Sequence, residues 1–174
     1  MTHNWKLLIN GEYREVSGDA DTPLIWPLRN QLDLISVRFG CGGEDCGACR
    51  ILVDDKPGWA CSMTLQQAEN SNIRTLEGIL EELPMKKLQE AFLQWNAGQC
   101  GYCLSGILVT ASHILTQYCI EKSRVPERAE IAQALDNHLC RCGAHNRIIT
   151  AIESAASNLL ESLPAHASLS ENCR

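Results

Sequence analysis

The spacing of the hydrophobic positions changes once along the chain, near residue 80. Before it, short runs alternate between apolar and polar positions, which is typical of half-buried strands. The expected strands cover residues 5–9, 13–16, 50–53, 59–63 and 73–76. Asn10-Gly11 predicts a hairpin turn between the first two. Leu24, Leu28 and Leu32 recur every fourth residue after Thr22-Pro23, which predicts one helix. The pattern in this half therefore predicts a small mixed sheet packed around one helix.

After residue 80 the apolar positions follow a helical period. Helices are expected over residues 86–95, 104–118, 126–135 and 148–159. Residues 104–118 are apolar on nearly every face, which is typical of the central helix of a bundle. The sequence thus predicts a sheet domain over residues 1–80, a helical domain over residues 81–163 and a flexible C-terminal tail over residues 164–174.

Composition and charge narrow the classes of protein that these 174 residues can form. Hydrophobic residues make up 45%, enough for a core, and the net charge is −6. Phosphate binding needs a basic face, so we expect no nucleic acid partner. No apolar run reaches the length of a membrane span, and residues 1–10 lack the pattern of a signal peptide. We expect no direct membrane insertion and a cytoplasmic location, or one at the periplasmic face of the inner membrane if a partner carries the chain there.

Four cysteines in the first half, here called the first cysteine set, have the spacing of a plant-type [2Fe–2S] site. Cys41, Cys46 and Cys49 form a Cys-x4-Cys-x2-Cys run, and Cys61 follows. Glycines in the run would let the loop wrap closely around a cluster and aim backbone N–H groups at its sulfurs; they are Gly40, Gly42, Gly43 and Gly47. A zinc site and a disulfide knot are the rival interpretations. The glycine-rich spacing and the missing secretory signal argue against both.

A second cysteine set lies in the helical half. Cys100 and Cys103 form one close pair, and Cys140 and Cys142 form another. Each pair precedes an expected helix, so both pairs can meet at one end of a bundle. Zinc is a serious competitor here, because structural zinc often takes two close pairs. The tight Cys-x-Cys spacing and the first motif favour a second cluster. Of the other two cysteines, Cys119 is expected in the core and Cys173 in the tail.

These motifs occur together in one order. They are Phe39 to Cys49, Cys61, Gln99-Cys100-Gly101-Tyr102-Cys103 and Leu139-Cys140-Arg141-Cys142. The combination resembles the iron–sulfur subunit of the xanthine dehydrogenase / aldehyde oxidoreductase family of molybdenum hydroxylases. The resemblance runs from about Leu7 to Leu160 and includes Asn10-Gly11 and Thr22-Pro23-Leu24-Ile25-Trp26.

The resemblance implies an α+β chain, with an N-terminal β-grasp [2Fe–2S] ferredoxin domain followed by an all-α four-helix-bundle domain that holds a second [2Fe–2S] cluster. It also implies a large partner subunit whose molybdenum–pterin cofactor lies nearest the bundle cluster. By the same resemblance, Gln99 and Cys142 contact the pterin. The two cysteine sets would then be the metal ligands.

Two segments depart from the usual family pattern. Leu104-Ser105-Gly106 stands in place of Thr-Pro-Gly, and Gly143-Ala144-His145 stands in place of Thr-Gly-Tyr. The second variant, with Leu24-Ile25-Trp26, is similar to the nicotinate, isoquinoline and aldehyde dehydrogenase branch. That branch acts on N-heteroaromatic or aldehyde substrates and often passes electrons to cytochrome c. A subunit that binds FAD is the other candidate acceptor.

A cluster with four thiolate ligands has no open coordination position, so the expected role is one-electron transfer in a hydroxylase complex, without catalytic residues in this chain. The alternative is a stand-alone ferredoxin-like carrier or a [2Fe–2S] redox sensor. A carrier needs only residues 1–80, so the helical half and Gln99 favour the role of a subunit. His145 is either a surface histidine or a residue that tunes a cluster. Glu44 and Asp45 form a solvated loop tip or an acidic docking edge.

Overall fold

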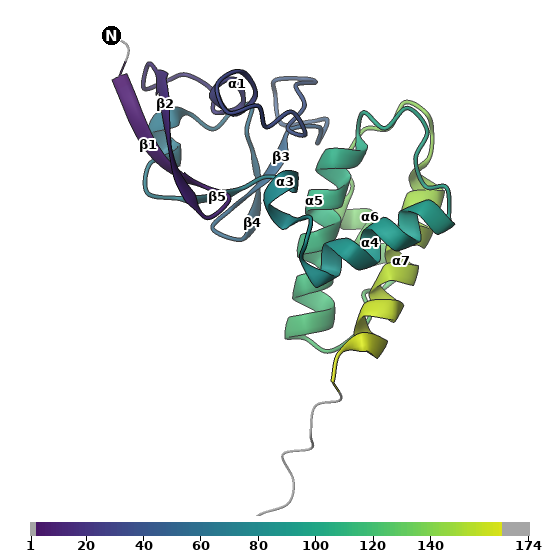
Figure 1. Cartoon of the computed structure of the whole chain (residues 1–174). Coiled ribbons are helices and arrows are strands. Elements are labelled where there is room, and N and C mark those ends of the chain that lie inside the picture. Colours follow the sequence, from purple (N-terminus) through teal and green to yellow (C-terminus); the bar gives the residue numbers. More distant parts are fainter. Residues whose placement is uncertain (1–2, 165–174) are drawn as a thin grey trace, which may run out of the picture.

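The computed structural model describes residues 3–164, and it places a β-sheet half before a helical half (Figure 1). Five strands form one sheet in the order β2-β1-β5-β3-β4. They are β1 (His3–Ile9), β2 (Glu12–Gly18), β3 (Arg50–Val53), β4 (Lys56–Trp59) and β5 (Asn72–Arg74). β1 pairs in parallel with β5, and the other pairs are antiparallel. Two short helices accompany the sheet, α1 (Ile25–Asn30) and α2 (Leu65–Ala68). The expected mixed α+β character is confirmed.

Helices make up the rest of the described chain. They are α3 (Leu76–Ile79), α4 (Leu83–Gln94), α5 (Leu104–Leu115), the π-helix η1 (Thr116–Glu121), α6 (Arg128–Ala134) and α7 (His145–Ser162). None of the helices within residues 3–164 has both the length and the apolar character needed to cross a membrane. The tail predicted over residues 164–174, with Cys173, lies outside the described residues except for its first position.

Two expected elements end earlier along the chain than the sequence pattern suggests, and the second strand of the β3–β4 hairpin also begins earlier, at Lys56. β4 ends at Trp59, so Cys61 lies in the following turn and not on a strand. The reason is the tight turn at Asp54 and Asp55, whose φ angles of 49° and 65° fit a two-residue hairpin, so pairing resumes at once at Lys56. α1 stops before Leu32, because Asp33 adopts a φ of 56° and turns the chain away from the helix axis.

Each half has its own hydrophobic core. The core of the sheet half includes Leu7, Leu24, Leu28, Ile51, Leu65 and Ile73. The core of the helical half includes Leu88, Ile107, Leu115, Cys119, Ile148 and Ile152. Leu52 belongs to the second core although it lies on β3, so neighbouring β3 residues point to opposite cores. Cys119 is fully buried, which confirms its assignment to the core.

Hydrogen bonds and close packing attach α3 and the start of α5 to the sheet half. The Ser36 backbone N–H and hydroxyl both donate to the Glu77 carboxylate, at 2.9 and 2.5 Å. The Arg38 guanidinium donates to the carbonyl of Gly101 at 2.7 Å. At Gly106 in α5 a Cβ atom would lie 1.9 Å from the carbonyl oxygen of Gly47. The start of α5 is therefore packed directly against the first cysteine loop.

Candidate iron–sulfur sites

The first cysteine loop presents backbone N–H groups to its own sulfur atoms. Gly43 and Asp45 both donate to Cys41 Sγ at 3.3 Å, and the Cys41 N–H donates to Cys46 Sγ at 3.3 Å. Such donors favour a negatively charged sulfur. Led by the bond from Gly43, they lower the pKa of Cys41 to about 7. The loop is therefore preorganised for thiolates.

The other two cysteines of this set lie deeper in the sheet half. Cys49 and Cys61 are both buried, and their thiols are neighbours. Burial, and then the adjacent Cys61, raises the pKa of Cys49 to about 12. A thiol in this position becomes a thiolate only when a cation offsets the burial, which a metal centre does.

Two glycines show why the loop carries no side chains at these places. Gly47 has a φ of 73°, and a Cβ there would lie 2.2 Å from His138 Nδ1. At Gly40 a Cβ would lie 2.5 Å from Cys46 Sγ. The loop needs both conformational freedom and close approach. The expected role of glycine in wrapping this loop has a direct geometric basis at these two positions.

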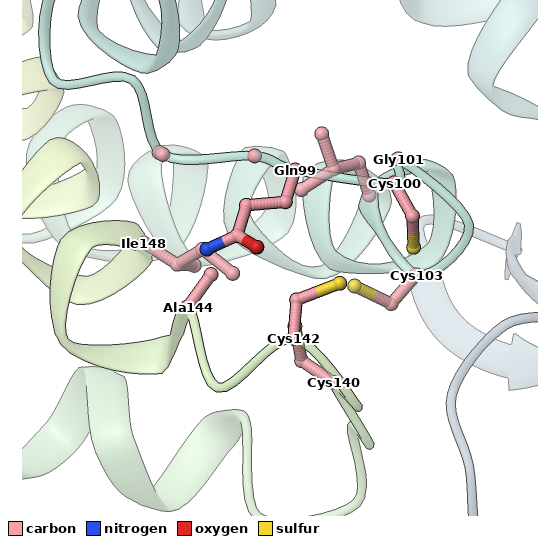
Figure 2. A pocket seen from close by; sticks show the side chains of 11 residues that line it. Gln99, Cys100, Gly101, Cys103, Cys140, Cys142, Ala144 and Ile148 are labelled. Carbon is pink, nitrogen blue, oxygen red and sulfur yellow. The ribbon is translucent and has the colours of Figure 1, made fainter.

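The second set converges from two segments onto one pocket. Cys100 and Cys103 come from the segment before α5, and Cys140 and Cys142 come from the segment before α7 (Figure 2). Cys103 is the N-cap residue of α5, and Ala144, two residues after Cys142, is the N-cap of α7. Helix N-termini stabilise nearby thiolates, because their free N–H groups and dipoles favour negative charge.

The pKa shifts in this pocket record which thiols are neighbours. Burial, followed by the adjacent Cys140, raises the pKa of Cys103 to about 12. The N–H of Tyr102, followed by the thiol of Cys142, lowers the pKa of Cys100. Burial raises the pKa of Cys140, but hydrogen bonds led by that from the Ala144 N–H lower it by more. The net effect is a lowered pKa. Cys103 is thus paired with Cys140, and Cys100 with Cys142.

The donor set fits a binuclear cluster. Each site offers two thiol pairs: Cys41 with Cys46 and Cys49 with Cys61 in one, and the two pairs above in the other. A [2Fe–2S] cluster requires this arrangement, since each of its two irons takes two thiolates. Among residues 3–164, no three His, Cys, Asp or Glu side chains are grouped closely enough to hold a single metal ion.

The remaining predicted residues lie around these sites. Gln99 lines the pocket of the second set, and Figure 2 shows its side chain extending toward Ala144 and Ile148. His145 is half-buried and its Nε2 is 2.8 Å from the carbonyl oxygen of His138, so it holds the segment before α7. Glu44 and Asp45 are exposed at the tip of the first loop.

His138, which lies between the two loops, is a residue that the sequence pattern does not indicate. It is only 2% exposed, and its Nε2 lies 2.9 Å from Thr110 Oγ1 on α5. Burial, assisted by the charges of Arg50 and His145, lowers its pKa to about 4, so the imidazole is neutral. Its neighbour Leu139 donates its N–H to the carbonyl oxygen of Cys46 at 3.1 Å. No periodic pattern signals such a residue, because it belongs to a loop whose contacts are distant in sequence.

Two family models match consecutive parts of the chain. The 2Fe-2S iron-sulfur cluster binding domain matches residues 7–75, and the [2Fe-2S] binding domain matches residues 75–153. A nicotinate dehydrogenase subunit of Pseudomonas putida is 40% identical over 152 residues, which cover 86% of this chain and 92% of that protein. The alpha subunit of isoquinoline 1-oxidoreductase from Brevundimonas diminuta is 35% identical over 152 residues, covering 87% and 96%.

Solved structures give the same picture. Quinoline 2-oxidoreductase from Pseudomonas putida 86 contains a chain that is 31% identical, with a TM-score of 0.81 and coverage of 92% of this chain and 98% of that one. The aldehyde oxidoreductase from Desulfovibrio desulfuricans is 32% identical with a TM-score of 0.79, and the match covers 93% of this chain and 19% of that one. The chain is thus similar to a whole chain of the first protein and to one part of the longer second chain.

Proposed function

The chain belongs to the iron–sulfur small subunits of the molybdenum hydroxylases, and on this premise we propose that its two cysteine sets conduct electrons from a large subunit to an external acceptor. Its cofactors are two [2Fe–2S] clusters, with the molybdenum–pterin on the large subunit. Its function is electron transfer in an oxidoreductase complex. The clusters supply one-electron chemistry, and the rest of the proposal concerns what this chain's residues do.

The ligand assignment carries the proposal. Cys41, Cys46, Cys49 and Cys61 bind one cluster, and Cys100, Cys103, Cys140 and Cys142 bind the other. The supporting observations are the backbone N–H groups that donate to sulfur atoms in the first loop and the single pocket that all four cysteines of the second set line. The backbone N–H groups that donate to the sulfur atoms of Cys41 and Cys46 would stabilise the added negative charge of the reduced state and so raise the reduction potential.

We propose the same division into two domains that the sequence predicts. Residues 1–80 form a β-grasp ferredoxin domain, and residues 81–163 form a four-helix bundle. A parallel β1–β5 pair at the centre of the sheet, with α1 packed beside it, supports the first assignment. The helices α4 to α7 and their common core support the second. The two family models meet at residue 75, close to this boundary.

Gln99 and Cys142 are proposed to meet the pterin of the large subunit. Both line one pocket at the end of the helical half, so a partner that covers it would touch both. Large apolar side chains are exposed around the two cysteine loops, among them Phe39, Tyr102 and Leu139. In a heteromeric complex, a partner subunit is expected to bury such a surface.

The finer identity of the partners is also proposed. The acceptor is a cytochrome c or an FAD subunit that faces the first cysteine loop, and the substrate is an N-heteroaromatic compound or an aldehyde. Relatives named for nicotinate, isoquinoline and aldehyde oxidation support this substrate class. The visible spectrum of the purified complex distinguishes the acceptors, because stoichiometric flavin without a haem partner would contradict the cytochrome.

Metal analysis of the anaerobically purified complex tests the proposal. Two clusters with distinct electron paramagnetic resonance (EPR) signals are expected, with iron and acid-labile sulfide in equal amounts and negligible zinc. One cluster together with one zinc would contradict the second ligand set. A chain that remains unassociated in native extracts would instead favour the alternative of a stand-alone carrier or sensor.

A further inference from the structure

Arg50 occupies a position beside the first cysteine set that the spacing of the cysteines does not indicate. It is the first residue of β3 and directly follows Cys49. Its cross-strand partner is Trp59 on β4, and its guanidinium carbon lies 3.4 Å from the centroid of the Trp59 ring. This cation–π contact holds the long side chain in one place. The charge is therefore fixed with respect to the cysteines.

The fold keeps this charge close to the deeper thiol pair, because Arg50 directly follows Cys49 and its partner Trp59 lies two residues before Cys61. The largest influence on the pKa of Arg50 is burial, which lowers it, but the guanidinium remains protonated. The groups that favour its charge are the thiols of Cys49 and Cys61 and the carboxylate of Glu44, all in or next to the first set. In the structure these are thiols, and they stand where cluster-bound thiolates would be.

The charge of Arg50 is poorly neutralised by its surroundings. Within residues 3–164 no carboxylate forms an ion pair with it, and its Nε is buried without a hydrogen-bond partner. Its contact with the Pro57 carbonyl oxygen is long, at 3.5 Å. Across the cleft toward α5 and α6, Glu130 is engaged by Arg124, at 2.6 and 2.8 Å. A half-buried cation with so few partners is weakly screened, so its field extends to the nearby cysteines.

We propose that Arg50 raises the reduction potential of the first cluster: its positive charge, held on the Trp59 ring next to the Cys49–Cys61 pair, stabilises the reduced state. The inference rests on the proposed ligation of that cluster by the first cysteine set. Reduction adds one electron to the cluster, so a nearby positive charge favours the reduced form over the oxidised form. Electrons that arrive from the large subunit would then reside mainly on the first cluster, whose loop faces the proposed acceptor.

The test is a redox titration of the purified complex, monitored by EPR so that each cluster is followed by its own signal. Arg50→Gln should lower the potential of the first cluster, with a change on the order of tenfold in the ratio of reduced to oxidised cluster at fixed potential, or about 59 mV for one electron. Arg50→Lys keeps a charge and should shift the potential less. The second cluster should keep its potential in both variants.

Arg14→Gln is the matched control, because Arg14 is an exposed arginine on the edge strand β2. It should leave both potentials unchanged. The difference between the wild type and Arg50→Gln should also persist at high salt, since a half-buried charge is screened less than an exposed one.

Three results would overturn the inference: an unchanged first potential in Arg50→Gln, an equal shift in Arg50→Lys, which would assign the effect to packing, or an equal shift of both clusters. Wild-type complex that lacks the first EPR signal would refute the proposed ligation itself. The failure of the proposed role of Arg50 is therefore distinguishable from a failure of the proposed cluster ligation.

Discussion

The backbone N–H of Leu139 donates a hydrogen bond to the carbonyl oxygen of Cys46, with a nitrogen–oxygen distance of 3.1 Å. Leu139 directly precedes Cys140 of the second cysteine set, and Cys46 belongs to the first. Covalent bonds and this single hydrogen bond thus form a continuous path between the two sets. Because Cys46 and Leu139 lie in different halves of the sequence, the fold and not the chain provides this short path.

Replacing Leu139 with proline should interrupt this path, because proline has no backbone N–H. The carbonyl of half-buried Cys46 would lose its donor, at a cost of about 1–3 kcal/mol in the free energy of unfolding. Electron exchange between the clusters should slow, as followed by freeze-quench EPR after reduction by substrate. Leu139→Ala keeps the N–H and is the control. Equal exchange rates in the two variants would contradict a role for this bond.

Substitution of single cysteines should remove the clusters independently. Cys46→Ser should abolish one EPR signal and about half of the iron, since a cluster loses stability without its fourth thiolate. Cys140→Ser should abolish the other signal and spare the first. Cys119→Ser, at a buried thiol outside both sets, should retain both signals. Loss of the same signal in Cys46→Ser and Cys140→Ser would show that the two sets do not form separate sites.

Gly106 should tolerate no side chain. A Cβ there would lie 1.9 Å from the carbonyl oxygen of Gly47, so Gly106→Ala must push α5 away from the first loop. The expected loss in the free energy of unfolding is about 1–3 kcal/mol, as for other overpacked sites. Gly43→Ala is the matched control, because its Cβ would meet only Asp45 Oδ2, at 3.7 Å. Urea unfolding measures both, and equal stability would show that the contact is easily relieved.

The Glu77 carboxylate should stabilise the attachment of α3 to the Ser36 segment in a pH-dependent way. Burial raises its pKa, but hydrogen bonds from Ser36 and Thr75 outweigh burial, so the pKa is lowered in the folded chain. Its contribution is therefore fully present above the unfolded pKa, about 4.3, and is lost as the pH falls through the folded pKa.

The variant that tests this is Glu77→Gln, which should cost about 1–2 kcal/mol of unfolding free energy at pH 7. The cost should stay constant between neutral pH and roughly pH 5.5 and should shrink below about pH 4.3. Glu81→Gln removes an exposed carboxylate that pairs with Lys86 and should cost little. A cost for Glu77→Gln that grows as the pH falls would contradict the assigned direction.

The acidic tip of the first loop should guide a basic acceptor. Charge reversal by Glu44→Lys or Asp45→Lys should slow reoxidation of the reduced complex, and added salt should slow the wild type in the same way. Reduction by substrate should be unaffected. Glu90→Lys, at an exposed position on α4, is the control. Reoxidation that is insensitive to both charge reversal and salt would exclude electrostatic docking at this loop.

Much of the fold follows from local patterns. The Asn10-Gly11 hairpin, the strand at β3 and the four longer helical segments are predictable, because each depends on turn chemistry or on the periodicity of neighbouring residues. Where element boundaries differ from the predicted ones, the cause is the backbone conformation of single residues. Asp33, Asp54 and Asp55 adopt positive φ angles, and only glycine or asparagine signals that conformation clearly in a sequence.

The sequence by itself determined which cysteines form the two candidate ligand sets, because cluster chemistry requires cysteine and the spacing of the cysteines is a local property of the loops. The tertiary structure decided how the two sites are joined. His138 fills the space beside Gly47, the Leu139 N–H donates to the Cys46 carbonyl, and the Trp59 ring holds the charge of Arg50 next to Cys49. These contacts join residues that are far apart in the sequence or depend on how a side chain is held. Their physical origin is the packing of α5 and the segment before α7 against the sheet half, and no pattern of neighbouring residues records it.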